Sequence, residues 1–114
     1  LGAVPMAAAI AALAPSDLDA FIVRKASKGY GTRRRIEGAL ASGARVVVVE
    51  DVITTGGSTK QAIEVLEEAG AEVCGVVGLV DRDLDRGPGE DALVDYRDRV
   101  FCAFTLSEIA SRLP

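Results

Sequence analysis

Hydrophobic residues gather into short runs along this chain, and the spacing within a run changes from one run to the next. Residues 45–52 contain four consecutive valines, and residues 72–82 form a second apolar run. Four unbroken valines indicate a strand that is buried on both faces, as in a parallel sheet covered by helices. Between the two runs, residues 59–69 follow a helical period. One face of this helix is apolar and contains Ala62, Ile63, Val65, Leu66 and Ala69. The opposite face is charged and contains Lys60, Glu64, Glu67 and Glu68.

This order predicts a strand–helix–strand unit, which is right-handed in nearly all proteins, with Gly70 ending the helix. Smaller elements precede the unit. Residues 1–15 are rich in alanine, carry a proline near each end and predict a helix that covers the sheet. Residues 20–25 predict a short buried strand, and residues 36–41 a brief helix. Between these two, residues 26–35 hold two glycines and four basic side chains, which predicts a mobile basic loop.

The segment that follows the unit begins with residues 84–93, which are rich in turn residues and predict a surface loop. Residues 99–104 predict a last strand, and a short terminal helix follows with Thr105 or Ser107 as its N-cap. The predicted class is therefore α/β, an open parallel sheet flanked by helices. We expect residues 1–114 to form one domain, since single domains contain roughly 100–150 residues.

Composition and charge exclude several classes of protein and of functional site. The chain is 49% hydrophobic and 26% charged, which excludes general disorder, and it lacks histidine, which excludes Ser-His-Asp triads and histidine metal sites. The two cysteines show no CxxC spacing, so we expect a cytoplasmic protein without disulfides. The first apolar segment is too short for a membrane span, which takes about 20 residues. The net charge of −4 and the few aromatic residues disfavour nucleic-acid binding.

The centre of the sequence combines the four-valine strand, an acidic pair and a turn that opens a helix. Glu50 and Asp51 come at the carboxyl end of the strand, where open α/β sheets bind ligands. The turn that follows has hydroxyl groups and glycines ahead of a helix N-terminus, a combination that favours a phosphate. A plain turn and helix cap would explain the turn alone, but not the acidic pair and strand beside it. Walker A and G-x-G-x-x-G patterns are both absent.

The segment VVVVEDVITTGGS resembles the phosphoribosyl diphosphate (PRPP) signature of the type I phosphoribosyltransferases. More narrowly, FIVRKASKGYGT, the IEG that follows it and GLVDRD resemble orotate phosphoribosyltransferases. The resemblance implies a PRPP site composed of thirteen residues: Arg24, Lys25, Lys28, Tyr30, Glu50, Asp51, Val52, Ile53, Thr54, Thr55, Gly56, Gly57 and Ser58. It implies that Thr54 and Arg82 contact orotate.

Within that set, the resemblance assigns catalysis to Arg24, Lys25, Lys28 and Asp51. The acidic pair would hold the ribose hydroxyls, the turn would cradle the 5-phosphate, and the basic loop would close on the pyrophosphate. It further implies magnesium bound mainly through PRPP, with no direct protein ligand, and a homodimer in which the basic loop reaches the partner's site. The reaction would form orotidine 5′-monophosphate and pyrophosphate for pyrimidine synthesis.

Two positions depart from the pattern: Tyr30 replaces a common His, and Val4 replaces a common Asp. The family's N-terminal hood and first core strand are also absent, so we expect the core of something longer, or a reduced paralogue, with an exposed apolar sheet edge. A PRPP-binding regulator, an inactive truncated paralogue and a transferase for another base remain alternatives. The intact RK-x-x-K pattern argues against a regulator, which has little need of a pyrophosphate lid.

Overall fold

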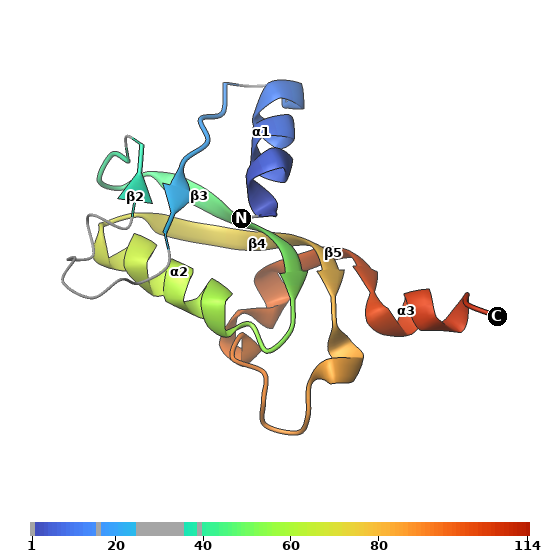
Figure 1. Ribbon diagram of the computed structural model, residues 1–114. Helices are drawn as coiled ribbons and strands as arrows, with labels where there is room; N and C mark the ends of the chain where they lie inside the picture. Colours follow the sequence, from blue (N-terminus) through green and yellow to red (C-terminus); the bar gives the residue numbers. More distant parts are fainter. Residues whose placement is uncertain (1, 16, 25–35, 39) are drawn as a thin grey trace.

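The computed structural model describes residues 2–15, 17–24, 36–38 and 40–114. Its centre is a parallel sheet in the order β3-β4-β5, formed by β3 (Arg45–Ile53), β4 (Glu72–Asp81) and β5 (Val100–Thr105). Helix α2 (Gly57–Glu68) connects β3 to β4 and lies along one face of the sheet, as Figure 1 shows. The predicted α/β class with an open parallel sheet is confirmed.

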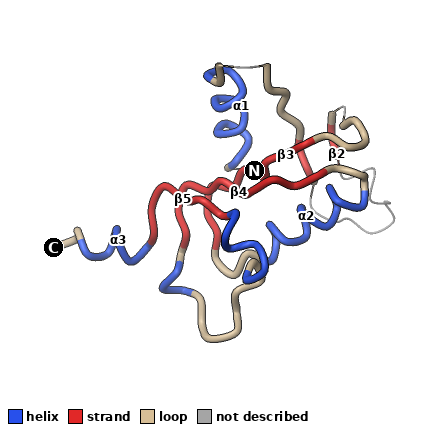
Figure 2. Tube along the Cα trace, turned by 180° about the vertical axis from the view of Figure 1, so that it is seen from behind, coloured by secondary structure: helices blue, strands red, loops and turns tan. Residues whose placement is uncertain are grey.

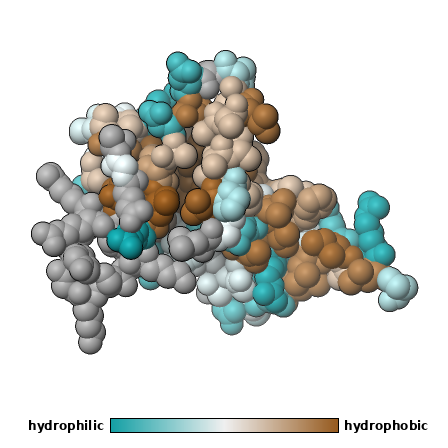
Figure 3. All heavy atoms as spheres, turned by 45° about the horizontal axis from the view of Figure 1, so that its top comes forward, coloured by the Kyte–Doolittle hydropathy of each residue, from teal (hydrophilic) through white to brown (hydrophobic). Residues whose placement is uncertain are grey.

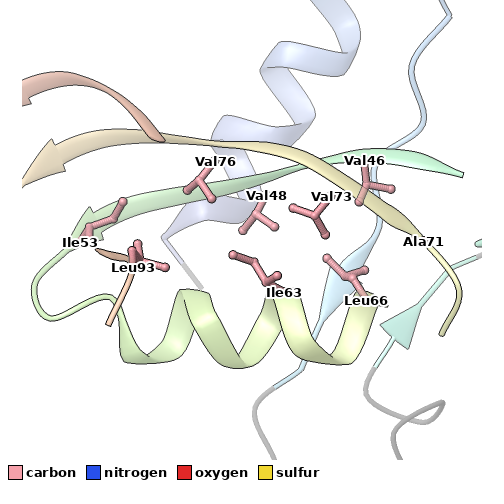
Figure 4. Packing of buried hydrophobic residues seen from close by; sticks show 9 residues of the cluster. All are labelled: Val46, Val48, Ile53, Ile63, Leu66, Ala71, Val73, Val76 and Leu93. Carbon is pink, nitrogen blue, oxygen red and sulfur yellow. The ribbon is translucent and has the colours of Figure 1, made fainter. Parts of the chain in front are cut away.

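The hydrophobic core lies between α2 and the sheet (Figure 4). Its members are aliphatic, as the scarcity of aromatic residues requires: Val46, Val48, Ile53, Ile63, Leu66, Ala71, Val73, Val76 and Leu93. The predicted inner face of α2 is confirmed, since Ile63, Val65 and Leu66 are buried. Leu93 is fully buried although it falls in the predicted surface loop, so this loop contributes to the core.

The end of α2 is set by Gly70, as predicted. Gly70 has a φ of +92°, a conformation that glycine adopts without a steric penalty. The N–H of Gly70 donates to the carbonyl of Glu67 at 3.0 Å, and the N–H of Ala71 donates to that of Leu66 at 3.0 Å. These two bonds form a Schellman motif, which satisfies carbonyls that the helix itself leaves unpaired.

For two segments that precede β3 in the sequence, the prediction is wrong in the type or the length of the element. The predicted buried strand over residues 20–25 is only β1 (Ile22–Val23), which is half-buried and pairs antiparallel with β2 (Ile36–Glu37) outside the parallel sheet. Strand β2 replaces the predicted helix over residues 36–41. Gly38 has a φ of +112°, which is incompatible with a right-handed helix at that position.

The second face of the sheet is less covered than the four valines predict. Val46 and Val48 face α2 and are 8% and 9% exposed, but Val47 is 52% exposed. Helix α1 (Ala3–Leu13) does not lie flat on this face, contrary to the predicted covering helix: Figures 1 and 2 show it standing away from the sheet with its first turn nearest β3. No residue of α1 is buried.

Apolar surface is therefore exposed on several elements, as Figure 3 shows. Leu13 on α1 is 84% exposed, and Phe101 and Phe104 on β5 are 64% and 50% exposed. Because β5 is an edge strand of the three-stranded sheet, the expected exposed apolar sheet edge is present there. None of the helices in the described residues combines the length and the hydropathy that a membrane crossing requires.

The C-terminal part of the chain is held by side-chain caps. Helix α3 (Leu106–Ser111) has Thr105 as its N-cap, whose hydroxyl accepts the N–H of Glu108 at 3.1 Å, so the first of the two predicted caps is confirmed. Two 3₁₀ turns precede β5, η2 (Asp83–Asp85) and η3 (Val94–Arg99). Asp83 accepts hydrogen bonds from the hydroxyl and the N–H of Ser107, and the hydroxyl bond is the main reason that its pKa is lowered.

The core makes a direct prediction about α2. Ile63 has no exposed surface, so Ile63→Ala should lower the free energy of unfolding by roughly 2–5 kcal/mol through lost burial and the cavity left behind. Urea denaturation followed by circular dichroism measures this loss. The neighbouring Glu64 is exposed, and Glu64→Ala should stay within about 0.5 kcal/mol of the parent chain. Equal losses in the two variants would contradict the assigned helix face.

Candidate phosphate-binding site

The candidate site lies where β3 leaves the sheet and α2 begins. Glu50 and Asp51 occupy the carboxyl-terminal part of β3, as predicted, and the connection to α2 follows directly. Gly56 is the N-cap of α2 and has a φ of +84°. The first turn of a helix carries N–H groups without intrahelical partners and a partial positive charge. The connection and the first turn therefore have the composition and geometry of an anion site.

Asp51 is packed against the start of α1. Its carboxylate Oδ1 accepts the N–H of Val52 at 2.9 Å. Its Oδ2 occupies the space that a side chain at Gly2 would fill. The absence of a side chain at Gly2 thus lets the first turn of α1 approach this carboxylate closely, and α1 helps to position one member of the acidic pair.

The segment between β4 and β5 contacts the connection from β3 to α2 and fixes its backbone. The N–H of Arg82 donates to the carbonyl of Ile53, and the N–H of Ala92 donates to that of Thr55, each at 2.8 Å. The side chain of Leu93 packs over Gly56 so closely that a Cβ there would lie 2.5 Å from Leu93 Cγ. The shape of the site therefore depends on residues 29 to 37 positions further along the chain.

A chain of ion pairs stiffens this support. Arg86 donates to the carbonyl of Thr54 at 2.7 Å and to Asp81 at 2.8 Å. The other carboxylate oxygen of Asp81 accepts from Arg97 at 3.1 Å, and Arg97 also donates to both oxygens of Asp91 at 2.8 and 3.0 Å. The hydrogen bonds that Arg97 donates to the carboxylate of Asp91 lower the pKa of Asp91 and raise the pKa of Arg97.

Among the predicted site residues that the structure describes, Arg82 is brought from a distant part of the chain to the end of β3. Arg82 directly follows β4, next to Ile53, and its side chain is about half exposed and pairs with Asp85. Arg24 follows β1 and is exposed. Lys25, Lys28 and Tyr30 lie outside the described residues.

Sequence reasoning missed the residues that support the site, above all Arg86 and Leu93. A signal was present, because residues 81–99 hold seven acidic and four basic side chains. Such a mixture indicates ion pairs, but it identifies neither their partners, up to 16 positions apart, nor the backbone carbonyl of Thr54, which lies 32 positions from Arg86. Among the described residues, no group of three or more His, Cys, Asp or Glu side chains has the arrangement of a metal site.

A match to a family model identifies the family of this chain. The model of the phosphoribosyl transferase domain matches residues 1–105. The chain belongs to the phosphoribosyltransferase family.

Curated relatives of this phosphoribosyltransferase-family chain carry a more specific name. The orotate phosphoribosyltransferase of Streptomyces avermitilis is 55% identical over 85 residues, which cover 72% of this chain and 47% of the relative. That of Aquifex aeolicus is 49% identical over 112 residues, which cover 96% of this chain and 60% of the relative. The chain thus spans about half the length of the curated relatives that it matches.

Solved structures of the family have the same fold. Orotate phosphoribosyltransferase from Aeropyrum pernix matches with a TM-score of 0.76 and 38% identity, over 98% of this chain and 60% of that chain. The Mycobacterium tuberculosis enzyme, solved with PRPP bound, matches with a TM-score of 0.72 and 35% identity, over 92% of this chain and 58% of that chain. The resemblance drawn from the sequence motifs is confirmed.

The contact between Gly56 and Leu93 predicts a marked cost for Gly56→Ala. The substitution adds a clash with Leu93, about 1–3 kcal/mol, to the strain of a positive φ, about 1–2 kcal/mol. Gly43→Ala is the matched control. Gly43 has a φ of +80°, but no atom of the described residues lies within 4 Å of the place that a methyl group would take, so this variant should show the strain alone. Urea denaturation of both variants checks this, and equal losses would contradict a tight Leu93 contact.

Asp91 predicts a pH-dependent contribution to the stability of the phosphoribosyltransferase fold. Its pKa is lower in the folded chain than the unfolded value of about 3.9, so its stabilising effect is complete above that value and disappears as the pH falls through the folded pKa. Asp91→Asn should therefore unfold at a lower temperature than the parent chain at pH 7, with a gap that closes below about pH 4. Thermal unfolding from pH 7 to 3 measures the gap. The exposed Asp95 supplies a control, Asp95→Asn, and a gap as large in that variant would contradict the assignment.

Proposed function

We propose that this chain is the PRPP-binding part of an orotate phosphoribosyltransferase. This enzyme transfers the 5-phosphoribosyl group from PRPP to orotate, which yields orotidine 5′-monophosphate and pyrophosphate for UMP synthesis. The observation that carries the proposal is the joining of the acidic pair to a glycine-containing connection at the N-terminus of α2. The names of the curated relatives support orotate as the base, and the Mycobacterium tuberculosis structure supports PRPP as the donor.

The residue roles follow from charge and position. The N–H groups and hydroxyls from Thr54 to Ser58 bind the 5-phosphate, which suits the positive end of α2. Glu50 and Asp51 bind the ribose hydroxyls, and their negative charge favours the positive charge that develops on the ribose as pyrophosphate departs. Arg82, whose N–H donates to the carbonyl of Ile53 at the end of β3, binds orotate, which is an anion.

Pyrophosphate is the leaving group, and its negative charge grows as its bond to the anomeric carbon of the ribose breaks and orotate bonds to that carbon. We assign its stabilisation to Arg24, Lys25 and Lys28, with Tyr30 as a neutral hydrogen-bond donor. Closure of such cations over the diphosphate would also exclude water, which competes with orotate for the ribosyl group.

Magnesium fits this site as a companion of PRPP. Mg²⁺ prefers to keep several waters and to bind one or two carboxylates together with substrate phosphates. Because the acidic pair is assigned to the ribose hydroxyls, the phosphates of PRPP and water would supply the ligands of the ion. When bound, the ion would neutralise part of the diphosphate charge.

We also propose a cytoplasmic homodimer in which the basic loop of one protomer reaches the site of its partner. Cys74 and Cys102 are both free, as suits a reducing compartment. Sedimentation of the purified chain tests the assembly, and a monomer at every concentration would contradict it.

Loss of orotate absorbance on addition of PRPP and magnesium tests the proposed reaction. We expect turnover by the purified chain, abolished by Lys28→Ala and retained in Arg112→Ala, which changes an exposed residue near the C-terminus. Arg82→Ala should raise the KM for orotate at least about tenfold, the effect of one lost charged hydrogen bond, with the affinity for PRPP unchanged.

Other outcomes assign the chain differently. Turnover of another base would overturn the assignment to orotate. PRPP binding without turnover of any base would contradict the transferase and favour a PRPP-binding regulator or an inactive paralogue. Calorimetric titration with PRPP separates this result from a chain that binds nothing.

A further inference from the structure

We propose that Arg86 is a positioning residue that orients the backbone N–H groups of the 5-phosphate loop, defined as residues 54–58. This inference rests on the proposed function of that loop. Arg86 does not belong to the predicted site, and it comes from the β4–β5 segment. Its side chain is 13% exposed, and one nitrogen, Nη1, bridges the carbonyl of Thr54 and the carboxylate of Asp81.

The geometry of the peptide group explains how Arg86 acts on the loop. A trans peptide is planar, and its C=O and N–H point in opposite directions. The carbonyl of Thr54 belongs to the same peptide group as the N–H of Thr55. When Arg86 holds this carbonyl at 2.7 Å, it fixes the N–H of Thr55 on the side away from itself.

The next peptide group is held in the same way. The carbonyl of Thr55 accepts the N–H of Ala92 at 2.8 Å, and this fixes the opposite direction for the N–H of Gly56. Two successive donors are thus oriented by contacts to their own carbonyls. Successive N–H groups that point to one side form an anion-binding concavity.

Arg86 also adds a polarising effect that the Ala92 bond lacks. A cation at the carbonyl oxygen strengthens the dipole of the peptide group, which makes the opposite N–H a better donor to phosphate. Asp81 holds Arg86 in place, and Arg97 holds the other oxygen of Asp81 at 3.1 Å. The chain of charges therefore connects the end of β4 to one peptide group of the loop.

The requirement for arginine is geometric. The guanidinium places donors in a planar fork, with Nη2 directed at the second oxygen of Asp81 at 3.5 Å while Nη1 reaches Thr54. A lysine ammonium on a flexible stem lacks this fixed fork. Arg86→Lys should therefore retain part of the effect, whereas Arg86→Met should remove it but keep much of the side-chain volume.

The test measures the affinities of the purified chain for ribose 5-phosphate, PRPP and inorganic pyrophosphate by calorimetric titration. Arg86→Met should weaken ribose 5-phosphate and PRPP about tenfold, the size of one lost charged hydrogen bond. Pyrophosphate should change less than about twofold, because it does not use the 5-phosphate loop. Arg86→Lys should fall between Arg86→Met and the parent chain.

Arg99→Met is the matched control. Arg99 also donates from a guanidinium to a backbone carbonyl, that of Val73 at 3.1 Å, but this carbonyl is at the opposite end of β4 from the loop. The control should keep the affinities for all three ligands, whatever its melting temperature. The amide NMR signals of Thr55 and Gly56 should shift in the ligand-free Arg86 variants and stay in place in the control.

Three results would overturn the proposal: unchanged ribose 5-phosphate affinity in folded Arg86→Met, equal weakening of all three ligands, or loss of folding in both Arg86 variants. The last two indicate a merely structural role. A parent chain that binds ribose 5-phosphate but does not consume orotate would contradict the proposed function and leave this inference standing. A parent chain that binds neither ribose 5-phosphate nor PRPP would overturn both.

Discussion

Gly56 turns the chain through a left-handed conformation between β3 and α2, and the side chain of Leu93 occupies the space beside it. This contact sets the path of the backbone where β3 ends and the first turn of α2, with its unpaired N–H groups, begins. The buried Leu93 joins the same core as Ile53 and Ile63, so the site and the core share one packing unit. The position of α2 and the shape of the site are therefore not independent.

The ion pairs around Asp81 are better understood as a means of orientation than as a source of stability. Removing charges from water costs free energy, and partly buried pairs often contribute little net stability. Asp81 nevertheless has two arginine partners, each of which is in turn held by a second polar contact. Such a chain leaves few alternative side-chain arrangements near the loop, which is the property that an anion site composed of backbone groups requires.

Much of the fold could be predicted from local patterns. The helical period of residues 59–69, the valine run of β3 and the end of α2 at Gly70 are each specified by neighbouring residues, and all appear in the structure. The errors arise where partners are distant. The exposure of Val47 depends on what covers the sheet, and β2 forms because β1 pairs with it, neither of which the spacing of apolar residues encodes.

The candidate site divides in the same way. Its predicted ligand-binding segment, from Glu50 to Ser58, is continuous in sequence, so a motif can reveal it. Its supporting part, Arg86 and Leu93, reaches the loop only through the β4–β5 segment, and the contact from Arg86 to Thr54 spans 32 positions. Every residue has a backbone carbonyl, so the type of a residue does not indicate whether its carbonyl accepts a hydrogen bond from a distant side chain. Support of this kind therefore becomes visible only in three dimensions, even when the motif that it serves can be read directly.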